Sequence, residues 1–306
     1  MVAGRVIVHM RAALAPHLDL LRLHFAPAWV LLFCSGTLLA AGNYGGFGWG
    51  VLVTAAVIAL LGFTGGLVLN DYVDRDFDRL DVDSRLTRYW RPFGTRPLVE
   101  GTISPSRARL VFAVLAAGAA ALALTLPWPH NLFVLAIMGW SYLAEYAYQV
   151  GKRRQRYPLA QILGRTDFAL FPVAGYLVLG FPDSTALLYF AFFYPFALAH
   201  LGANDIADIT NDRARGLQTI PVLYGMAGAS RWVLAFALVH AAAALLFAAV
   251  LGPIARAGLV AGLACVMVAT VGLVRHPEES AGLRLLPLFH LALALYAGGI
   301  VIDYVV

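Results

Sequence analysis

Nine apolar segments, each long enough to cross a lipid bilayer as a helix, follow one another along this chain of 306 residues. A membrane-spanning helix needs about 20 predominantly apolar residues. The segments span about residues 25–42, 49–70, 108–127, 131–149, 163–181, 185–203, 231–252, 256–274 and 284–304. Only 13% of the residues are charged and the mean hydropathy is +0.77, whereas a soluble domain carries roughly 25% charged residues. The chain is therefore predicted to be an integral membrane protein.

The composition of the segments favours helices over strands. Their interiors are rich in Leu, Ala, Val, Gly and Phe, and lipid satisfies the backbone only in a helix or a closed barrel. A barrel would need segments of about ten residues with alternating polarity, and runs such as 116–123 do not alternate. We expect an all-α protein with nine transmembrane helices in one domain over residues 1–306, with cap loops at about 71–107, 150–163 and 204–230.

The basic residues predict which way the chain crosses the membrane. The N-terminal segment carries Arg5, Arg11 and Arg22, and the connections after the even-numbered spans are long and basic. With nine spans, all of the 22 Lys and Arg residues except Arg256 fall on one side. The positive-inside rule places the N-terminus in the cytoplasm and the C-terminus outside, and we expect the plasma membrane of a prokaryote. The net charge of +5 is thus explained by topology, and no nucleic acid is expected as a partner.

Two copies of the motif NDxxDxxxD stand where the second and sixth spans meet the cytoplasmic side. The first begins at Asn70 and the second at Asn204. Within each copy the Asn and two of the Asp residues are four positions apart, so they line one helix face. Asp71 and Asp205 lie about 100° away and could reach the same cavity from its flank. Because the copies are four spans apart, they predict two related four-helix halves followed by a ninth helix.

Carboxylates at a membrane boundary are costly and usually mark a site. Grouped acids repel one another unless a cation neutralises them, and hard oxygen ligands suit Mg²⁺ shared with phosphate oxygens. The predicted metal ligands are Asn70, Asp74, Asp78, Asn204, Asp205, Asp208 and Asp212. The predicted catalytic residues are Asp71, Asp74, Asp78, Asp205, Asp208 and Asp212. The alternative, solvated helix-end acids balanced by arginines, is preferred for Asp76, Asp81 and Asp83.

A site for Mg²⁺ and diphosphate also needs cations that hold the leaving group. Arg22, Arg96 and Lys152 are the candidates, and Lys152 is the only lysine in the chain. For Arg96 and Lys152 the alternative is a purely topological role among the positive-inside residues. Tyr142 and Tyr146 could line a cavity where a carbocation forms, because a ring face stabilises positive charge. Their alternative is the aromatic belt at the membrane interface.

At these residues the chain resembles the UbiA superfamily of intramembrane prenyltransferases. Residues 70–78 match the first signature of that superfamily, and residues 204–212 match the second. The tail at 213–225 is similar to that of chlorophyll synthases and archaeal lipid prenyltransferases, and 21–23 resembles the N-terminal Arg segment. One difference is that the Arg96-Pro97 pair comes later than usual, after the charged stretch 79–95.

The resemblance implies a bundle of nine helices around a central cavity, in which aspartates hold Mg²⁺ against an isoprenyl diphosphate. The implied activity is transfer of the isoprenyl group to a lipophilic or aromatic acceptor in the membrane. A terpene cyclase of the same superfamily, in which the chain captures its own cation, is the nearest alternative. An ion-coupled transporter is a more distant one, because it predicts carboxylates at mid-membrane and broken helices. The acceptor and the length of the prenyl chain stay open.

Overall fold

The structure, a computed structural model, describes residues 14–305, so Arg5 and Arg11 lie outside the described residues. Over this range the chain forms helices and no strands. The helices are η1 (Leu23–Phe25), α2 (Ala26–Tyr44), α3 (Trp49–Asp78), α4 (Arg85–Trp90), α5 (Pro105–Leu124), α6 (His130–Gly151), α7 (Leu159–Gly164), α8 (Thr166–Tyr176), α9 (Ser184–Ala207), α10 (Ile209–Ala214), α11 (Ile220–Phe247), η2 (Ala248–Val250), α12 (Pro253–Arg275) and α13 (Glu279–Val305).

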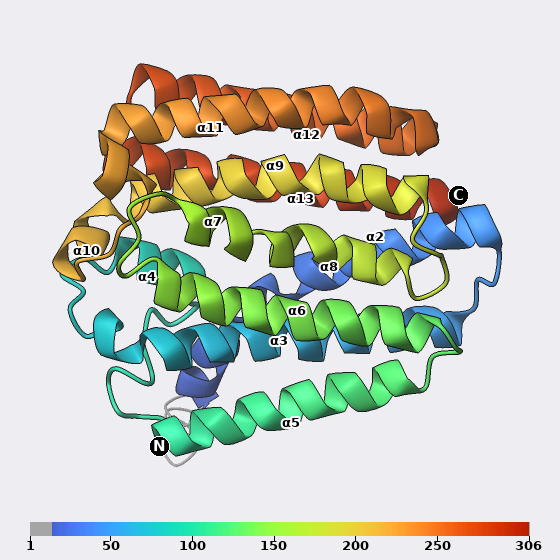
Figure 1. The fold of residues 1–306 in the computed structure, drawn as a ribbon, viewed down its shortest axis with the longest axis horizontal. Helices are drawn as coiled ribbons and strands as arrows, with labels where there is room; N and C mark the ends of the chain where they lie inside the picture. Colours follow the sequence, from blue (N-terminus) through green and yellow to red (C-terminus); the bar gives the residue numbers. More distant parts are fainter. Residues whose placement is uncertain (1–13, 306) are drawn as a thin grey trace, which may run out of the picture.

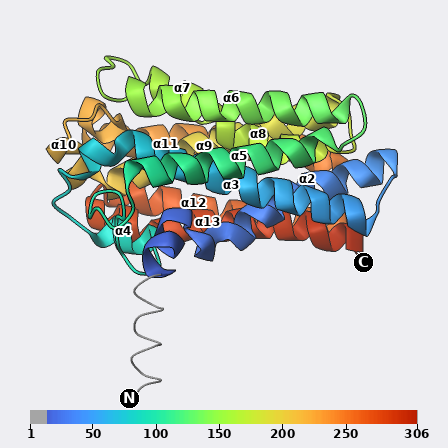
Figure 2. The same ribbon diagram turned by 90° about the horizontal axis from the view of Figure 1, so that it is seen from below.

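The long helices run side by side across the molecule (Figure 1). Helices α11 and α12 form one edge, α9 and α13 come next, α2 and α8 follow, and α3 and α6 lead to α5 at the other edge. The short helices α4 and α10 lie together at one end of the bundle, which we call the cap end (Figures 1 and 2). The longest connections between the helices, such as the one from α3 to α5, therefore lie at the cap end.

Contacts between distant residues define the two ends of the bundle. At the cap end, the Thr210 hydroxyl donates a hydrogen bond of 2.7 Å to Glu279, at the start of α13. At the far end, Asp183 caps α9 by accepting from the Ala186 amide at 2.8 Å. Asp183 also accepts hydrogen bonds from Tyr44 and Tyr176. Asp183 thus has a structural role at the far end.

Seven helices between residues 14 and 305 are long and apolar enough to cross a membrane: α2 (joined with η1), α3, α5, α9, α11 (joined with η2), α12 and α13. The predicted span 131–149 corresponds to α6, which has 22 residues and carries the ionisable Glu145. The predicted span 163–181 is not one helix, because the helix is interrupted at Arg165, between α7 and α8. The predicted all-helical membrane fold is confirmed. The prediction of nine spans is not, because only seven of the described helices are long and apolar enough to cross a membrane.

The cavity lies among the middle helices of the bundle, and the helices at the two edges do not line it. Its described wall takes residues from α2, α3, α4, α6, α8, α9 and α10 and none from α5, α11, α12 or α13. Large aromatic side chains fill the space between α9, α11 and α13 instead, as shown by Phe192, which lies 4.9 Å from Tyr296 and 5.0 Å from Phe247 between ring centroids. These three rings are buried, so this part of the bundle is a packed aromatic core.

Helices α2 and α8 pack so closely that only glycine fits at two positions. A Cβ atom added to Gly175 would lie 1.9 Å from the Phe33 carbonyl oxygen, and one added to Gly36 would lie 2.1 Å from the Pro172 oxygen. Small residues let helix backbones approach in this way in membranes. The contact fixes one wall of the cavity.

Candidate active site

One cavity of about 290 Å³ opens among α3, α6, α8 and α9 beneath the cap end. This volume is at the low end of the range for ligand pockets, about 300–1,000 Å³. Asp74 and Asp78 of the first motif and Asp205, Asp208 and Asp212 of the second line the same cavity. The fold thus brings together two motifs that begin 134 residues apart, at Asn70 and Asn204.

The other end of the cavity is apolar and aromatic. Trp29 of α2 stacks on Phe63 of α3, with ring centroids 4.3 Å apart, and meets the edge of Phe168 at 5.6 Å. Ile137 and Phe171 continue this wall. The cavity therefore joins a charged end to an end that suits a hydrocarbon chain.

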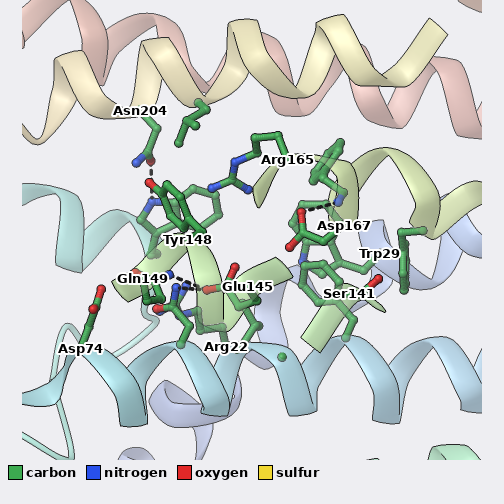
Figure 3. A pocket seen from close by; sticks show the side chains of 18 of the residues that line it. Arg22, Trp29, Asp74, Ser141, Glu145, Tyr148, Gln149, Arg165, Asp167 and Asn204 are labelled. Atoms are coloured by element: carbon green, nitrogen blue, oxygen red, sulfur yellow. Dashed lines mark hydrogen bonds between the residues drawn. The ribbon is translucent and has the colours of Figure 1, made fainter. Parts of the chain in front are cut away.

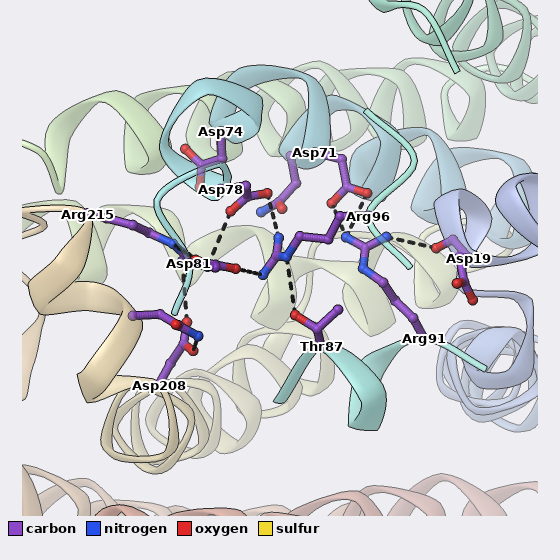
Figure 4. Close-up of polar contacts among 12 residues, drawn as sticks. Asp19, Asp71, Asp74, Asp78, Asp81, Thr87, Arg91, Arg96, Asp208 and Arg215 are labelled. Carbon is purple, nitrogen blue, oxygen red and sulfur yellow. Dashed lines mark hydrogen bonds and ion pairs between the residues drawn. The ribbon is translucent and has the colours of Figure 1, made fainter. Parts of the chain in front are cut away.

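The carboxylates of the first motif are paired with basic side chains, and Figure 4 shows this for Asp71 and Asp78. Lys152 Nζ lies 2.7 Å from Asp74 Oδ2, and Arg153 lies 3.5 Å from the other oxygen of that carboxylate. Arg96 Nη1 lies 2.5 Å from Asp78 Oδ2. The predicted cations Lys152 and Arg96 thus contact the predicted acids directly.

Arg215, in the turn after α10, connects the two motifs (Figure 4). Its guanidinium lies 3.3 Å from Asp78 and 3.3 Å from Asp208, and its side chain is 6% exposed. It also lies 2.5 Å from Asp81 and 4.0 Å from Asp212. Although burial works against ionisation, these four carboxylates raise the pKa of Arg215 above its ordinary value. Arginines balance Asp81 as expected, namely Arg96 and Arg215, but the expectation that Asp81 is solvated is wrong, because its side chain is only 13% exposed.

The second motif carries more negative charge than its neighbours neutralise. Burial, and then repulsion by Asp208 and Asp205, raises the pKa of Asp212 well above its ordinary value. Asp212 accepts a hydrogen bond of 2.7 Å from the Thr219 hydroxyl, and Asn211 donates one of 2.8 Å to Asp208. An additional cation at this point would relieve the repulsion.

Asp71 does not reach the cavity, contrary to the prediction. It is 4% exposed and is absent from the described cavity wall. Arg22 lies 2.6 Å from Asp71 Oδ1, and Arg91 donates to both carboxylate oxygens at 2.9 Å. Because Asp71 is turned about 100° from Asn70 around the helix, it holds these two arginines in place instead.

The two asparagines of the motifs are engaged by side chains of other helices. Asn70 Nδ2 donates a hydrogen bond of 2.6 Å to Glu145 Oε1, while Asn204 Oδ1 accepts one of 3.2 Å from Trp90 of α4. Figure 3 shows Glu145 and Asn204 on different walls of the cavity. Trp90 places the stretch 79–95 directly over the site.

Of the two predicted cavity tyrosines, only Tyr142 lines the cavity. Tyr146 is 51% exposed and lies outside the described wall, so its prediction as a cavity residue is wrong. The inward face of α6 is centred near Glu145. Tyr142 lies about 60° from that centre, whereas Tyr146 lies about 100° from it and faces the surroundings.

Several cavity residues were missed from the sequence. Arg91 and Arg215 look like any other positive-inside arginine, and the sequence carries no signal of their burial. Glu145, Arg165 and Asp167 did carry a signal, because ionisable residues inside an apolar segment usually face a cavity. All three line this one.

Residues 29–294 match the sequence profile of the UbiA prenyltransferase family. The chain belongs to this family. It is 30% identical over 219 residues to the 4-hydroxybenzoate octaprenyltransferase of Albidiferax ferrireducens, covering 71% of this chain and 69% of that protein. It is 34% identical over 235 residues to the digeranylgeranylglyceryl phosphate synthase of Halobacterium salinarum, covering 74% and 76%. The resemblance to UbiA enzymes and the prediction of a prenyltransferase are thus confirmed at the level of the family.

Solved structures show the same fold. A UbiA homolog from Aeropyrum pernix K1 superposes with a TM-score of 0.73 at 22% identity, covering 90% of this chain and 97% of that one. A UbiA homolog from Archaeoglobus fulgidus, solved with DMAPP and Mg²⁺, gives a TM-score of 0.68 at 20% identity, covering 94% and 99%. The UbiA fold therefore extends over nearly the whole chain.

Proposed function

We propose that this member of the UbiA family transfers an isoprenyl group from a prenyl diphosphate to a lipophilic or aromatic acceptor within the membrane and releases diphosphate. The observation that carries the proposal is a single cavity with both acidic motifs at its charged end and aromatic side chains at its apolar end. Lys152, Arg96 and Arg22 line the charged end and are proposed to bind the diphosphate. The names of the two relatives above support prenyl transfer.

The donor atoms of the charged end fit Mg²⁺, which prefers carboxylate and amide oxygens together with phosphate oxygens. Residues 14–305 contain no group of three His, Cys, Asp or Glu side chains arranged to hold an ion by themselves, so phosphate oxygens would share the ion with this chain. The proposed ligands are Asn70, Asp74, Asp78, Asn204, Asp205, Asp208 and Asp212. Bound there, Mg²⁺ would neutralise charge that develops on the departing diphosphate.

The chain's own residues would orient the donor and exclude water. Lys152 and Arg96 contact the same carboxylates that face the cavity, so they lie close enough to contact a diphosphate that Mg²⁺ would hold beside those carboxylates. Trp29, Phe63 and Tyr142 offer ring faces to an allylic cation. Helix α4 covers the charged end, and exclusion of water there would protect the cation from hydrolysis.

We also propose the finer architecture that the sequence predicts. In it, α6 and the α7–α8 pair complete nine spans, arranged as two related four-helix halves followed by α13. Residues 1–306 would form one prenyltransferase domain, with cap loops at about 71–107, 150–163 and 204–230. The cap end and the N-terminus would face the cytoplasm of a prokaryotic cell at its plasma membrane, with the C-terminus outside. The basic cap-end loops support this orientation.

The test is Mg²⁺-dependent release of diphosphate by the reconstituted protein, measured with prenyl diphosphates of increasing length and mass spectrometry of the lipid phase. Asp74→Asn and Asp208→Asn are expected to lower the rate at least about 100-fold, because each removes charge that positions the leaving group. Asp76→Asn is the matched control, since Asp76 is 59% exposed and pairs only with Arg75 and Arg79 among the described residues.

Two outcomes bear on the proposal. Products formed without an added acceptor would identify a cyclase rather than a transferase. No release with any donor, although wild type and variants bind it equally, would show that the motifs do not form a diphosphate site.

A further inference from the structure

Arg231 is a charged residue inside an apolar helix, away from the cavity. It belongs to α11, within the stretch Ile220–Val250 that is long and apolar enough to cross a membrane. Its side chain is exposed and does not line the cavity. None of the ion pairs formed within residues 14–305 includes it. Because a charge in a membrane span is costly, it usually marks a contact with a specific partner.

Arg231 lines an open groove on the outer surface of the bundle. The other described lining residues are Pro158, which precedes α7, and Tyr224, Gly228 and Trp232 of α11. The groove has a volume of about 540 Å³. The segment before α7 and the start of α11 both lie toward the cap end (Figure 1). The groove is therefore close to the level at which the apolar helices leave the membrane.

Two glycines shape this groove. Gly225 has a φ of 71°, a left-handed conformation that interrupts the helical backbone of α11. A Cβ atom added to Gly228 would lie 2.6 Å from Cβ of Tyr224, so a larger residue at 228 would push the tyrosine away. The Tyr224 side chain is 48% exposed. The turn at Gly225 and the small residue at 228 together place an exposed phenol ring against the groove wall.

Trp232 forms a fixed part of the groove wall and indicates its depth. Its Nε1 donates a hydrogen bond of 2.9 Å to the carbonyl oxygen of Leu198 in α9, and a Cβ atom added to Gly202 would lie 2.8 Å from its ring. Leu198 is ten residues before Asp208, or about 15 Å along a helix. Arg231 is thus attached below the acidic motifs, and its long side chain can extend to the membrane interface.

The charge around the groove is entirely positive among the described residues. Arg154 and Arg156, shortly before Pro158, are exposed and take part in no ion pair within residues 14–305. The described lining residues include no carboxylate. A phosphate group would find a charged donor in Arg231, whereas the ammonium group of a zwitterionic lipid would find no acid. The groove therefore favours a head group with a net negative charge.

We propose that this groove binds one anionic phospholipid, with the head-group phosphate on Arg231 and an acyl chain beside Trp232. The phosphodiester carries one negative charge, which matches the single guanidinium of the groove. Arg154 and Arg156 add a longer-range attraction for the same head group. No described residue lines both the groove and the cavity, so the inference goes beyond the proposed prenyl transfer and does not rest on it.

The test measures quenching of tryptophan fluorescence in bilayer nanodiscs by lipids whose acyl chains carry bromine. One series contains brominated phosphatidylglycerol in phosphatidylcholine, and the other contains brominated phosphatidylcholine in phosphatidylglycerol. The contribution of Trp232 is the difference between wild type and Trp232→Phe. Half of it should be quenched at a mole fraction of the anionic brominated lipid about fivefold lower than that of the zwitterionic one.

Arg231→Gln should bring these two mole fractions to within about twofold of each other, whereas Arg275→Gln should leave the difference unchanged. Arg275 is the matched control because it is exposed in the last turn of α12 and lies outside the groove. Equal quenching by the two lipids in wild type, or no quenching that depends on Trp232, would overturn the proposal. So would a preference that survives in Arg231→Gln, or one that both variants lose, since the latter reflects surface charge alone.

A second measurement does not need the Trp232 variant. In detergent, added phosphatidylglycerol should raise the Tm of wild type more than phosphatidylcholine does, and Arg231→Gln should lose this difference while Arg275→Gln keeps it. Equal effects of the two lipids on wild type would overturn the proposal. Displacement of phosphatidylglycerol by a prenyl diphosphate, together with a raised KM for that donor in Arg231→Gln, would also overturn it and would assign the groove to the donor.

Discussion

Replacing Arg215 should lower the unfolding temperature (Tm) of the protein when Mg²⁺ is absent. Its 6% exposed side chain lies within 3.3 Å of Asp78, Asp81 and Asp208. Breaking a buried ion pair from one side costs about 3–5 kcal/mol, because the remaining charge stays buried without compensation. We use the lower half of this range, about 3–4 kcal/mol, since the side chain of Asp81 is 13% exposed and can regain some solvation. At roughly 2–4 °C per kcal/mol, Arg215→Gln should lower Tm by about 6–16 °C.

The assay is thermal unfolding of the purified protein in detergent with a chelator, followed by titration with Mg²⁺. Because the freed carboxylates would bind the ion, Mg²⁺ should restore more of the Tm in Arg215→Gln than it adds to wild type. The double variant Arg215→Gln/Asp81→Asn should be more stable than Arg215→Gln alone, since it removes one uncompensated charge. A Tm loss below about 2 °C, or one that neither Mg²⁺ nor Asp81→Asn reduces, would refute this account of the site.

Two further predictions concern the packing and the far end of the bundle. Gly175→Ala should cost about 1–3 kcal/mol, because its Cβ would lie 1.9 Å from the Phe33 carbonyl oxygen. Gly139→Ala, with open space around it, should leave Tm unchanged, and equal effects of the two would contradict the packing argument. Asp183→Ala should cost about 1–2 kcal/mol near neutral pH through the loss of the helix cap and two tyrosine hydrogen bonds. Although burial opposes the shift, these hydrogen bonds lower the pKa of Asp183, so its contribution is present above the unfolded-state pKa and disappears as the pH falls through the folded-state pKa. A difference in Tm that persists at acid pH would contradict this.

The long helices and the acidic face of α3 could be predicted from the sequence, because hydrophobic periodicity and charge determine them. The apolar segments located the long helices, and the spacing of Asp74 and Asp78 predicted one acidic face, because helical geometry alone determines which residues share a side. Helix α3 runs to Asp78, beyond the apolar segment that ends at about residue 70, as the helical spacing of the motif predicted. The sequence could not predict the break at Arg165, which divides the fifth predicted span.

Side-chain partners were harder to predict than helices. The pairing of Arg91 with Asp71 and of Arg215 with both motifs depends on how loops fold over the cap end, and many arginines nearby have the same local sequence character. The prediction for Tyr146 was wrong because Tyr146 lies about 40° further around α6 than Tyr142. This difference is enough to turn its side chain out of the cavity. Burial in three dimensions, rather than residue type, decides such cases.

The pairing of the motif aspartates with arginines and lysine has a consequence for turnover. When diphosphate leaves, the buried carboxylates and basic side chains of such a site would ordinarily lose their charge partners without regaining contact with water. Here Lys152 and Arg96 can form ion pairs with Asp74 and Asp78 as the proposed product leaves. Each ion pair lost with the diphosphate would then be replaced by one within the protein. Under the proposed function, these ion pairs would lower the barrier to diphosphate release and leave the site ready for the next prenyl diphosphate.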